Sequence, residues 1–285
     1  MSRIVYVNGE YLPEEEAKVS IFDRGFLFAD GVYEVTSVLD GRLVDFEGHT
    51  HRLERSLREL DMTNPMHMGD LLEVHRELIK RNDLQEGGIY LQISRGVADR
   101  DFVYPAGLKP TVVLFTTAMN LSDSPKAKTG LRIIAIDDLR WGRRDIKTVQ
   151  LLYPSMGKMM AKAAGVDDAW MLEDGFVTEG TSNNAYIVTH DGRIVTRQLG
   201  HEILSGITRN AVLRFAREAQ MVVEERPFTV DEARGSAEAF VTSATTFVTP
   251  VVEIEGTVLG DGKPGPVARR LREIYIEEAR KSLAV

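Results

Sequence analysis

Four short turns constrain the fold of this chain more than any other feature of its sequence. Each is an Asn-Gly or Asp-Gly pair beside runs of β-forming residues, and both residues of such a pair tolerate the positive φ of a tight hairpin turn. Antiparallel hairpins are therefore expected along much of the chain. The four pairs are Asn8-Gly9, Asp40-Gly41, Asp174-Gly175 and Asp191-Gly192.

Helical periodicity of apolar residues accompanies these strand signals and makes the expected fold class α+β. The mixture differs from the regular alternation of a βαβ chain. Helices are predicted at Gly48–Leu60, Gly206–Gln220 and Pro264–Ser282. Further strands are predicted at Ile89–Ser94, Thr111–Thr117, Leu131–Ile136 and Ala239–Thr242.

The length of 285 residues, with 43% hydrophobic content, favours about two domains. The polar stretch Ala118–Gly130 holds Pro125 and Gly130 and separates two strand-like runs. We therefore expect a small N-terminal domain at 1–120, a linker at 121–129 and a larger domain at 130–285.

Charge and composition exclude several classes of protein. The net charge of −8 disfavours nucleic-acid binding, and the lack of cysteine excludes disulfides and zinc–thiolate sites. His49 and His51 have no matching carboxylates or thiolates, so no metal site is expected. The N-terminus lacks the apolar region of a secretory signal and no stretch has the length of a membrane span, so a cytoplasmic location without membrane contact is expected.

Lys147 is the first candidate for chemistry. Most lysines are solvated surface charges. Lys147, however, follows Ile146 and precedes Val149 and two leucines. A lysine among apolar neighbours can lose its charge and attack an aldehyde. Lys158 and Lys162, in a helical run, are the rival candidates.

Glu179 lies between two β-rich runs in a segment full of hydroxyl and amide groups. Such a carboxylate is usually a turn residue or a helix cap. It could also face a pyridine nitrogen and hold it protonated, which makes the ring an electron sink. Both interpretations stay open on the local sequence alone.

Three further places could bind a phosphate. Leu204–Arg209 opens a helix, whose free N–H groups attract anions, although an ordinary serine cap is more common there. The turn Thr242–Thr246 is rich in hydroxyls, and its alternative is a polar loop. Arg52 lies near a helix start, either on the solvated face or as a phosphate clamp.

The order of six motifs decides between these alternatives. They are F-x-x-G-x-Y-E-V at Phe28–Val35, H-x-x-R-L at His49–Leu53, D-I-K at Asp145–Lys147, V-T-E-G-x-x-x-N at Val177–Asn184, L-x-G-I-T-R at Leu204–Arg209 and V-T-P-V at Val248–Val251. Together they run through nearly the whole chain. This pattern resembles the fold-type IV pyridoxal-phosphate enzymes, which comprise branched-chain aminotransferases, D-amino-acid aminotransferases and aminodeoxychorismate lyases.

The resemblance implies pyridoxal 5'-phosphate as cofactor and a role for each matching residue. Lys147 would hold the cofactor as a Schiff base and shuttle the substrate proton, and Glu179 would pair with the ring nitrogen. The family also implies a homodimer, with a small N-terminal α/β domain and a larger, β-rich C-terminal one. The phosphate would be held by Arg52, Ile207, Thr208, Ser243 and Thr245.

The stretch from Tyr90 to Pro105 resembles D-amino-acid aminotransferases most. In that group an arginine at the place of Arg100 binds the substrate carboxylate, helped by a tyrosine matching Tyr33 and by a histidine two residues on. Here that position is Phe102, which cannot donate a hydrogen bond. Arg100 has an alternative as a solvated loop charge, because Asp99 and Asp101 flank it.

The predicted function is thus transfer of the amino group of a D-amino acid to a 2-oxo acid by ping-pong chemistry. A branched-chain L-amino-acid aminotransferase is the first alternative. An (R)-amine transaminase and an aminodeoxychorismate lyase are the others within the family. A non-enzymatic homologue is disfavoured, because it would not need both Lys147 and Glu179.

Overall fold

The computed structural model describes residues 2–282, which form two compact units. The first holds the chain up to Asn120 and Ile146–Gln150, and the second holds Leu121–Asp145 and Leu151–Lys281. The stretch 121–129 lies in the second unit and includes helix α4 (Pro125–Thr129). The short segment that contains Lys147 therefore belongs to the first unit, although it is far from the rest of that unit in sequence.

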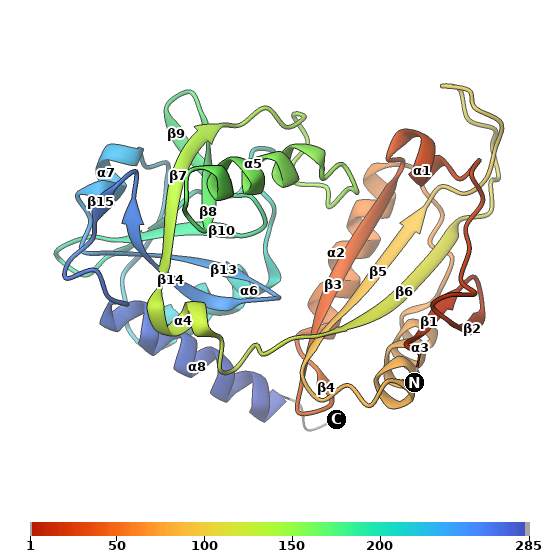
Figure 1. Cartoon of the computed structure of the whole chain (residues 1–285), viewed down its shortest axis with the longest axis horizontal. Coiled ribbons are helices and arrows are strands. Elements are labelled where there is room, and N and C mark those ends of the chain that lie inside the picture. The colour runs from red at the N-terminus through yellow and green to blue at the C-terminus, as the bar shows by residue number, and fades with distance from the viewer. Residues whose placement is uncertain (1, 283–285) are drawn as a thin grey trace. The chain divides into compact units, whose positions relative to one another are not determined.

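The first unit contains an antiparallel sheet in the order β2-β1-β6-β5-β3-β4 (Figure 1). The hairpins predicted at Asn8-Gly9 and Asp40-Gly41 are confirmed, and all four turn residues have positive φ. The strands are β1 (Ile4–Val7), β2 (Glu10–Pro13), β3 (Gly31–Leu39), β4 (Arg42–Leu43), β5 (Gly87–Ser94) and β6 (Thr111–Ala118).

Helices α1 (Arg24–Phe28), α2 (Phe46–Glu59) and α3 (Met68–Arg81) complete the described part of this unit. Helix α2 matches the predicted helix and buries Leu53 and Leu57, one turn apart. Helix α3 was not predicted, although its Leu71 and Leu78 are buried in the same way. Contacts of α2 with β3, and of α3 with β1 and β6, bury these apolar stripes against the sheet.

The described residues of the second unit form a nine-stranded sheet in the order β12-β11-β10-β13-β14-β7-β8-β9, with β15 paired to β14. The Asp174-Gly175 turn joins β8 to β9 as predicted, and Asp191-Gly192 lies between β10 and β11. The strands are β7 (Leu131–Asp137), β8 (Asp168–Glu173), β9 (Phe176–Gly180), β10 (Asn184–Val188), β11 (Ile194–Thr196), β12 (Val223–Glu225), β13 (Glu238–Ser243), β14 (Phe247–Ile254) and β15 (Thr257–Val258).

Besides the antiparallel hairpins that the turns predicted, this sheet contains parallel pairs of strands. Strand β7 pairs in parallel with both β8 and β14, and β11 pairs in parallel with β12. Parallel neighbours need a long crossover. Helix α5 (Leu152–Ala163) supplies it between β7 and β8, and α6 (Ile207–Glu218) between β11 and β12. Helices α7 (Val230–Arg234) and α8 (Pro266–Ser282) complete the described elements.

The register of the second sheet brings distant polar segments to one place. Asn184, at the start of β10, is the partner of Thr242, at the end of β13. The hydroxyl-rich turn after β13 therefore lies beside the start of β10, above a core that contains Trp170 and Phe228. Among the described residues, no helix combines the length and apolar composition that crossing a membrane requires.

Candidate active site

Lys147 is held in an extended segment against the edge of β3. The Tyr33 amide donates to the Lys147 carbonyl at 3.0 Å, and the Val149 amide donates to the Gly31 carbonyl at 3.1 Å. The Lys147 Nζ atom lies 4.1 Å from the centre of the Tyr33 ring, and the side chain is half-buried. Two of the predicted site residues, Lys147 and Tyr33, are therefore in contact.

The two rival lysines lie on α5 in different surroundings. Lys158 pairs with the buried Asp168 at 2.8 Å, and its own side chain is 44% exposed. Lys162 is exposed. Lys158 is thus engaged by a carboxylate and Lys162 faces the surface, whereas Lys147 lies against an aromatic ring.

Arg52 is buried in the first unit and does not lie on a solvated face. Its Nε and Nη2 atoms donate to the two carboxylate oxygens of Glu34, each at 2.7 Å, and His49 Nδ1 contacts Glu34 Oε2 at 2.7 Å. Burial alone would raise the pKa of Glu34. The charge and hydrogen bonds of Arg52, with His49, outweigh burial and lower that pKa from 4.5 to about 2.

Arg100 lies in the loop between β5 and β6. Among the described residues its guanidinium carbon lies 5.6 Å from the centre of the Phe28 ring and 5.9 Å from that of Phe102. These two rings meet edge to face at 5.6 Å. The family resemblance led us to expect a histidine at position 102. In this chain Phe102 stands there, and its ring and that of Phe28 lie beside Arg100.

Glu179 is buried in the second unit, and both its oxygens accept hydrogen bonds. Arg140 Nη1 donates to Oε1 at 2.6 Å, while Asn184 Nδ2 and the Leu204 amide donate to Oε2 at 3.0 and 3.2 Å. Burial raises the pKa of Glu179 and Arg140 opposes the rise, but the net direction remains upward. Glu179 is thus neither a turn residue in water nor a helix cap.

These contacts explain why two of the motifs occur together. Asn184 closes V-T-E-G-x-x-x-N, and its Nδ2 atom also donates to the carbonyl of Leu204, which opens L-x-G-I-T-R. A Cβ atom on Gly206 would lie 2.1 Å from Asn184 Oδ1, so any larger residue there would force the Asn184 side chain to move. One amide side chain therefore ties the carboxylate to the start of α6.

The start of α6 has the features of an anion site. Gly206 is the N-cap residue and provides no side-chain cap, so the predicted alternative of a Ser205 cap is not observed. The first-turn amides belong to Ile207 and the following residues, and Thr208 is buried. Ser243 and Thr245 lie in the hydroxyl turn with 3.4 Å between their oxygens. This set could hold a phosphate.

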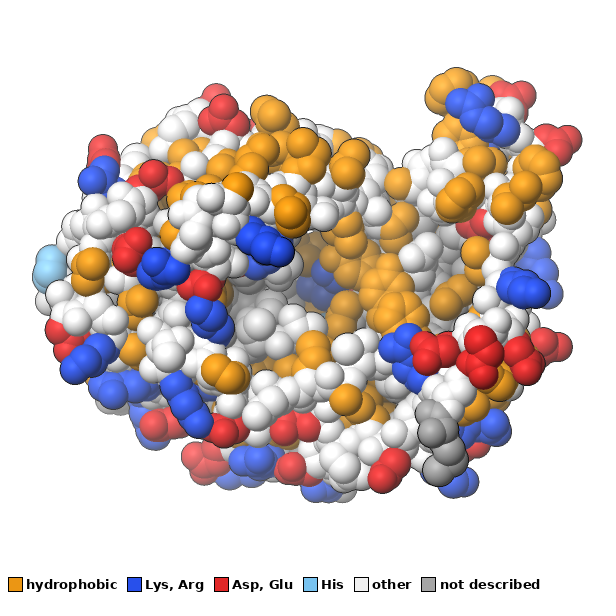
Figure 2. Space-filling view, viewed as in Figure 1, with side chains coloured by type: hydrophobic (Ala, Val, Ile, Leu, Met, Phe, Trp, Pro, Cys, Tyr) orange, Lys and Arg blue, Asp and Glu red, His pale blue; other side chains and the backbone are white. Residues whose placement is uncertain are grey.

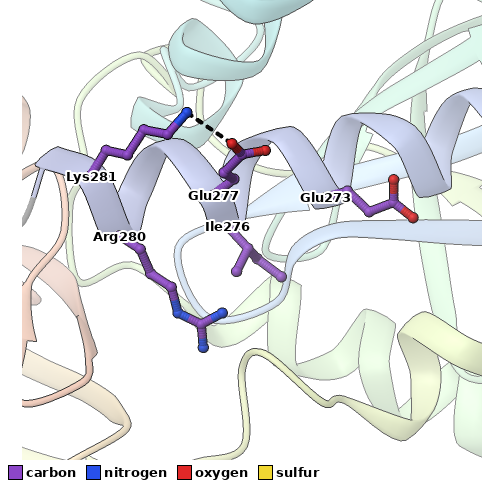
Figure 3. A pocket seen from close by; sticks show the side chains of 5 residues that line it. All are labelled: Glu273, Ile276, Glu277, Arg280 and Lys281. Carbon is purple, nitrogen blue, oxygen red and sulfur yellow. Dashed lines mark ion pairs between the residues drawn. The ribbon is translucent and has the colours of Figure 1, made fainter.

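Two surface hollows have a different character. One is lined by Ile276 and four charged side chains of a single helix, α8, where Lys281 pairs with Glu277 at 2.8 Å (Figure 3). The other lies beside α2 and α3 and is lined by Phe46, His51 and Arg76 among others. Neither contains any of the residues predicted for the site.

Comparison with known proteins identifies the family. The family described as "Amino-transferase class IV" matches residues 31–254. The chain is 38% identical to the D-alanine aminotransferase of Staphylococcus haemolyticus over 272 residues, which cover 94% of this chain and 95% of that protein. The chain belongs to the class IV aminotransferases.

Solved structures agree with this membership. The branched-chain aminotransferase of Escherichia coli superposes with a TM-score of 0.90, at 22% identity, over 97% of this chain and 94% of that one. That of Thermoproteus uzoniensis superposes with a TM-score of 0.89, at 26% identity, over 100% and 97%. Another branched-chain aminotransferase, solved with pyridoxamine 5'-phosphate, has a TM-score of 0.88 at 27% identity, over 98% and 94%. The predicted two-domain α+β fold is therefore confirmed. The prediction that the protein is a pyridoxal-phosphate-dependent aminotransferase is confirmed as well.

Several residues of this class IV aminotransferase escaped the sequence analysis. Glu34 stands inside a motif quoted for the family but received no role, and it holds Arg52. Arg140 received no role from the sequence, and it holds Glu179. Asp138 was not noticed at all. The one signal was the Asp-x-Arg spacing just after a strand, which is too common to indicate a site.

Proposed function

We propose that this class IV aminotransferase moves the amino group of a D-amino acid to a 2-oxo acid. The donor becomes a 2-oxo acid and the acceptor becomes an amino acid, so atoms and electrons balance without another oxidant. The observation that carries the proposal is the similarity to the D-alanine aminotransferase of Staphylococcus haemolyticus, which extends over nearly the full length of both chains.

Lys147 is the proposed catalytic residue. Pyridoxal phosphate, once bound, accepts electrons from the substrate α-carbon. The Nζ amine of Lys147 is the group that attaches the cofactor and then moves the α-proton. Lys147 Nζ lies beside the Tyr33 ring, whereas Lys158 forms an ion pair with Asp168, and this difference supports Lys147 for the role.

The other assignments follow the chemistry of each group. Glu179 offers a buried carboxylate to the ring nitrogen of the cofactor. The amides of Ile207 and Thr208, the hydroxyls of Ser243 and Thr245, and the guanidinium of Arg52 are the proposed phosphate ligands. Glu34 already binds two N–H groups of Arg52, and this contact orients the guanidinium.

For the substrate carboxylate we propose Arg100 and Tyr33. A planar guanidinium suits a carboxylate because it can donate two parallel hydrogen bonds. Phe28 and Phe102 face Arg100 with their rings, which cannot accept the in-plane pair of hydrogen bonds that a carboxylate can. Replacing Phe102 with histidine should add a hydrogen-bond donor, and we expect a lower KM for D-alanine in Phe102→His.

We also propose that the protein works as a homodimer. In the first unit Ile21, Phe26, Phe102 and Val103 are each more than two-thirds exposed, and Figure 2 shows hydrophobic side chains gathered over the loop between β5 and β6. Exposed apolar patches of this kind mark protein–protein contacts, and a second copy of this chain is the partner we infer. The amide of Ala98 donates to the carbonyl of Phe22 at 3.2 Å, so the segment before α1 and the loop between β5 and β6 lie side by side.

Sedimentation tests the dimer. The unaltered protein should sediment as a dimer, and Phe26→Asp should shift it toward the monomer. Val222→Asp, at an exposed position of the second unit, is the control and should stay dimeric. A monomeric unaltered protein would contradict the proposal.

Visible spectra test the enzymatic proposal. Protein loaded with pyridoxal phosphate should absorb visible light, Lys147→Ala should lose this band, and Lys158→Ala should keep it. D-alanine without acceptor should bleach the band, whereas L-leucine should not. If only L-leucine bleaches it, the protein is a branched-chain aminotransferase, the alternative favoured by the likeness to the Thermoproteus uzoniensis structure. If Lys147→Ala keeps the band, the assignment of Lys147 is wrong.

A further inference from the structure

Glu179 belongs to a buried array of three charged side chains. Arg140 donates to Asp138 through Nε at 2.9 Å and through Nη2 at 2.7 Å, and to Glu179 through Nη1 at 2.6 Å. The side chains of Asp138, Arg140 and Glu179 are 0%, 12% and 6% exposed. One guanidinium thus joins two carboxylates inside the second unit.

Asp138 fixes the position of that guanidinium. Its Oδ2 atom also accepts a hydrogen bond from Thr178 Oγ1 at 2.7 Å, one residue before Glu179 on β9. Burial would raise the pKa of Asp138, but Arg140 and Thr178 together lower it, so Asp138 is ionised. Because Nε and Nη2 of Arg140 are bound to Asp138, the plane of the guanidinium is fixed, with Nη1 directed toward Glu179.

Glu179 depends on this arginine for its charge. Its other contacts, Asn184 and the Leu204 amide, are neutral dipoles. Burial disfavours the carboxylate, and Arg140 is the cation that opposes this effect. A buried glutamate without its cation takes up a proton and can no longer serve as an ionic acceptor.

We propose that Arg140, anchored by Asp138, is a positioning residue that keeps Glu179 ionised and aimed at the ring nitrogen of the cofactor. The proposal rests on the proposed role of Glu179. It assigns to Arg140 control over how strongly the ring nitrogen holds its proton, and so over how readily the substrate α-proton leaves. Arg140 itself need touch neither substrate nor cofactor.

The chain offers a matched control in Arg144. It is also a buried arginine, and it contacts Asp138 at 3.5 Å and Glu173 at 2.8 Å, but among the described residues it does not pair with Glu179. Arg140→Met and Arg144→Met therefore remove similar buried charges from the same array. Only the first change removes the cation from Glu179.

The test is a pH titration of the visible absorbance of the loaded enzyme. In Arg140→Met the midpoint should move to higher pH, because loss of positive charge on the ring nitrogen makes the nitrogen contributed by Lys147 more basic. The rate of bleaching by D-alanine should fall about tenfold or more with little change in KM. Arg140→Lys, which keeps a cation without the planar fork, should recover part of both effects.

A double variant tests whether Arg140 changes the titration midpoint through Glu179. If Arg140 acts through Glu179, adding Arg140→Met to Glu179→Gln should not move the midpoint further. A midpoint in Arg140→Met equal to that in Arg144→Met would overturn the proposal, and so would a further shift in the double variant. An unaltered enzyme without a cofactor band would instead contradict the proposed function.

Discussion

Two buried glutamates, one in each unit, meet an arginine in different ways. Glu34 receives two N–H groups of Arg52 and a contact from His49. Glu179 receives a single N–H group of Arg140, whose other donors go to Asp138. The pKa of Glu34 falls to about 2, whereas that of Glu179 is raised.

The difference indicates that the pKa of a buried glutamate depends on how many N–H groups of the neighbouring arginine face it. Where two N–H groups of one guanidinium face the same carboxylate, as in Arg52 and Glu34, the negative charge of that carboxylate is strongly stabilised. Where the guanidinium is shared between two carboxylates, the second carboxylate stays basic enough to accept another donor. Glu34 therefore has the character of a structural group, and Glu179 that of a group that interacts with a ligand.

The largest expected effect breaks the Arg52–Glu34 pair. Glu34→Gln leaves Arg52 buried without a counter-charge, and we expect the free energy of unfolding to fall by about 3–5 kcal/mol. Urea denaturation at neutral pH measures this. Glu179→Gln, which replaces a carboxylate that burial already disfavours, is the matched variant and should cost much less. Equal losses would remove the distinction between the two pairs.

Acid should weaken the same pair. The pKa of Glu34 is lower in the folded protein than its ordinary value of 4.5, so its contribution to stability is complete above pH 4.5 and is lost as the pH falls toward 2. The stability difference between the unaltered protein and Glu34→Gln should shrink by about 3 kcal/mol across this window. A difference independent of pH would show that the charge of Glu34 is not responsible.

A measurement of catalytic activity tests the role of Glu179, the glutamate of the second unit. Glu179→Gln should slow amino transfer from D-alanine about 100-fold, because an amide cannot hold the ring nitrogen protonated. Steady-state kcat with a saturating 2-oxo acid measures the effect. Retained kcat in a variant that binds pyridoxal phosphate normally would remove Glu179 from the mechanism.

The smallest expected effect concerns one hydrogen bond to Glu34. His49→Leu removes the imidazole contact but leaves both bonds from Arg52 to Glu34. We expect a loss of about 1–2 kcal/mol in the free energy of unfolding, in the range for a hydrogen bond to a charged group. A loss as large as that in Glu34→Gln would mean that His49, and not Arg52, holds the carboxylate.

Features that depend on residues close together in the sequence were mostly predicted, whereas the pairing of distant strands was not. The turn at Asn8-Gly9 and the helix around Leu53 depend on neighbours a few residues away, and both were predicted. Helix α3 was missed, although its buried residues Leu71, Val74 and Leu78 also recur at helical spacing. The parallel pairing of β7 with β8 and β14 was also missed, because no local pattern encodes which distant strand becomes a neighbour.

For the candidate site, the sequence alone determined the family, the cofactor and a set of residue types in a specific order. Lys147, Glu179 and the L-x-G-I-T-R motif could be identified because chemistry restricts which residues can occupy those positions. Only the tertiary structure decided which arginine meets which carboxylate. Arg52 joins Glu34 across 18 residues and Arg140 joins Glu179 across 39, and such pairing depends on how strands pack rather than on spacing along the chain.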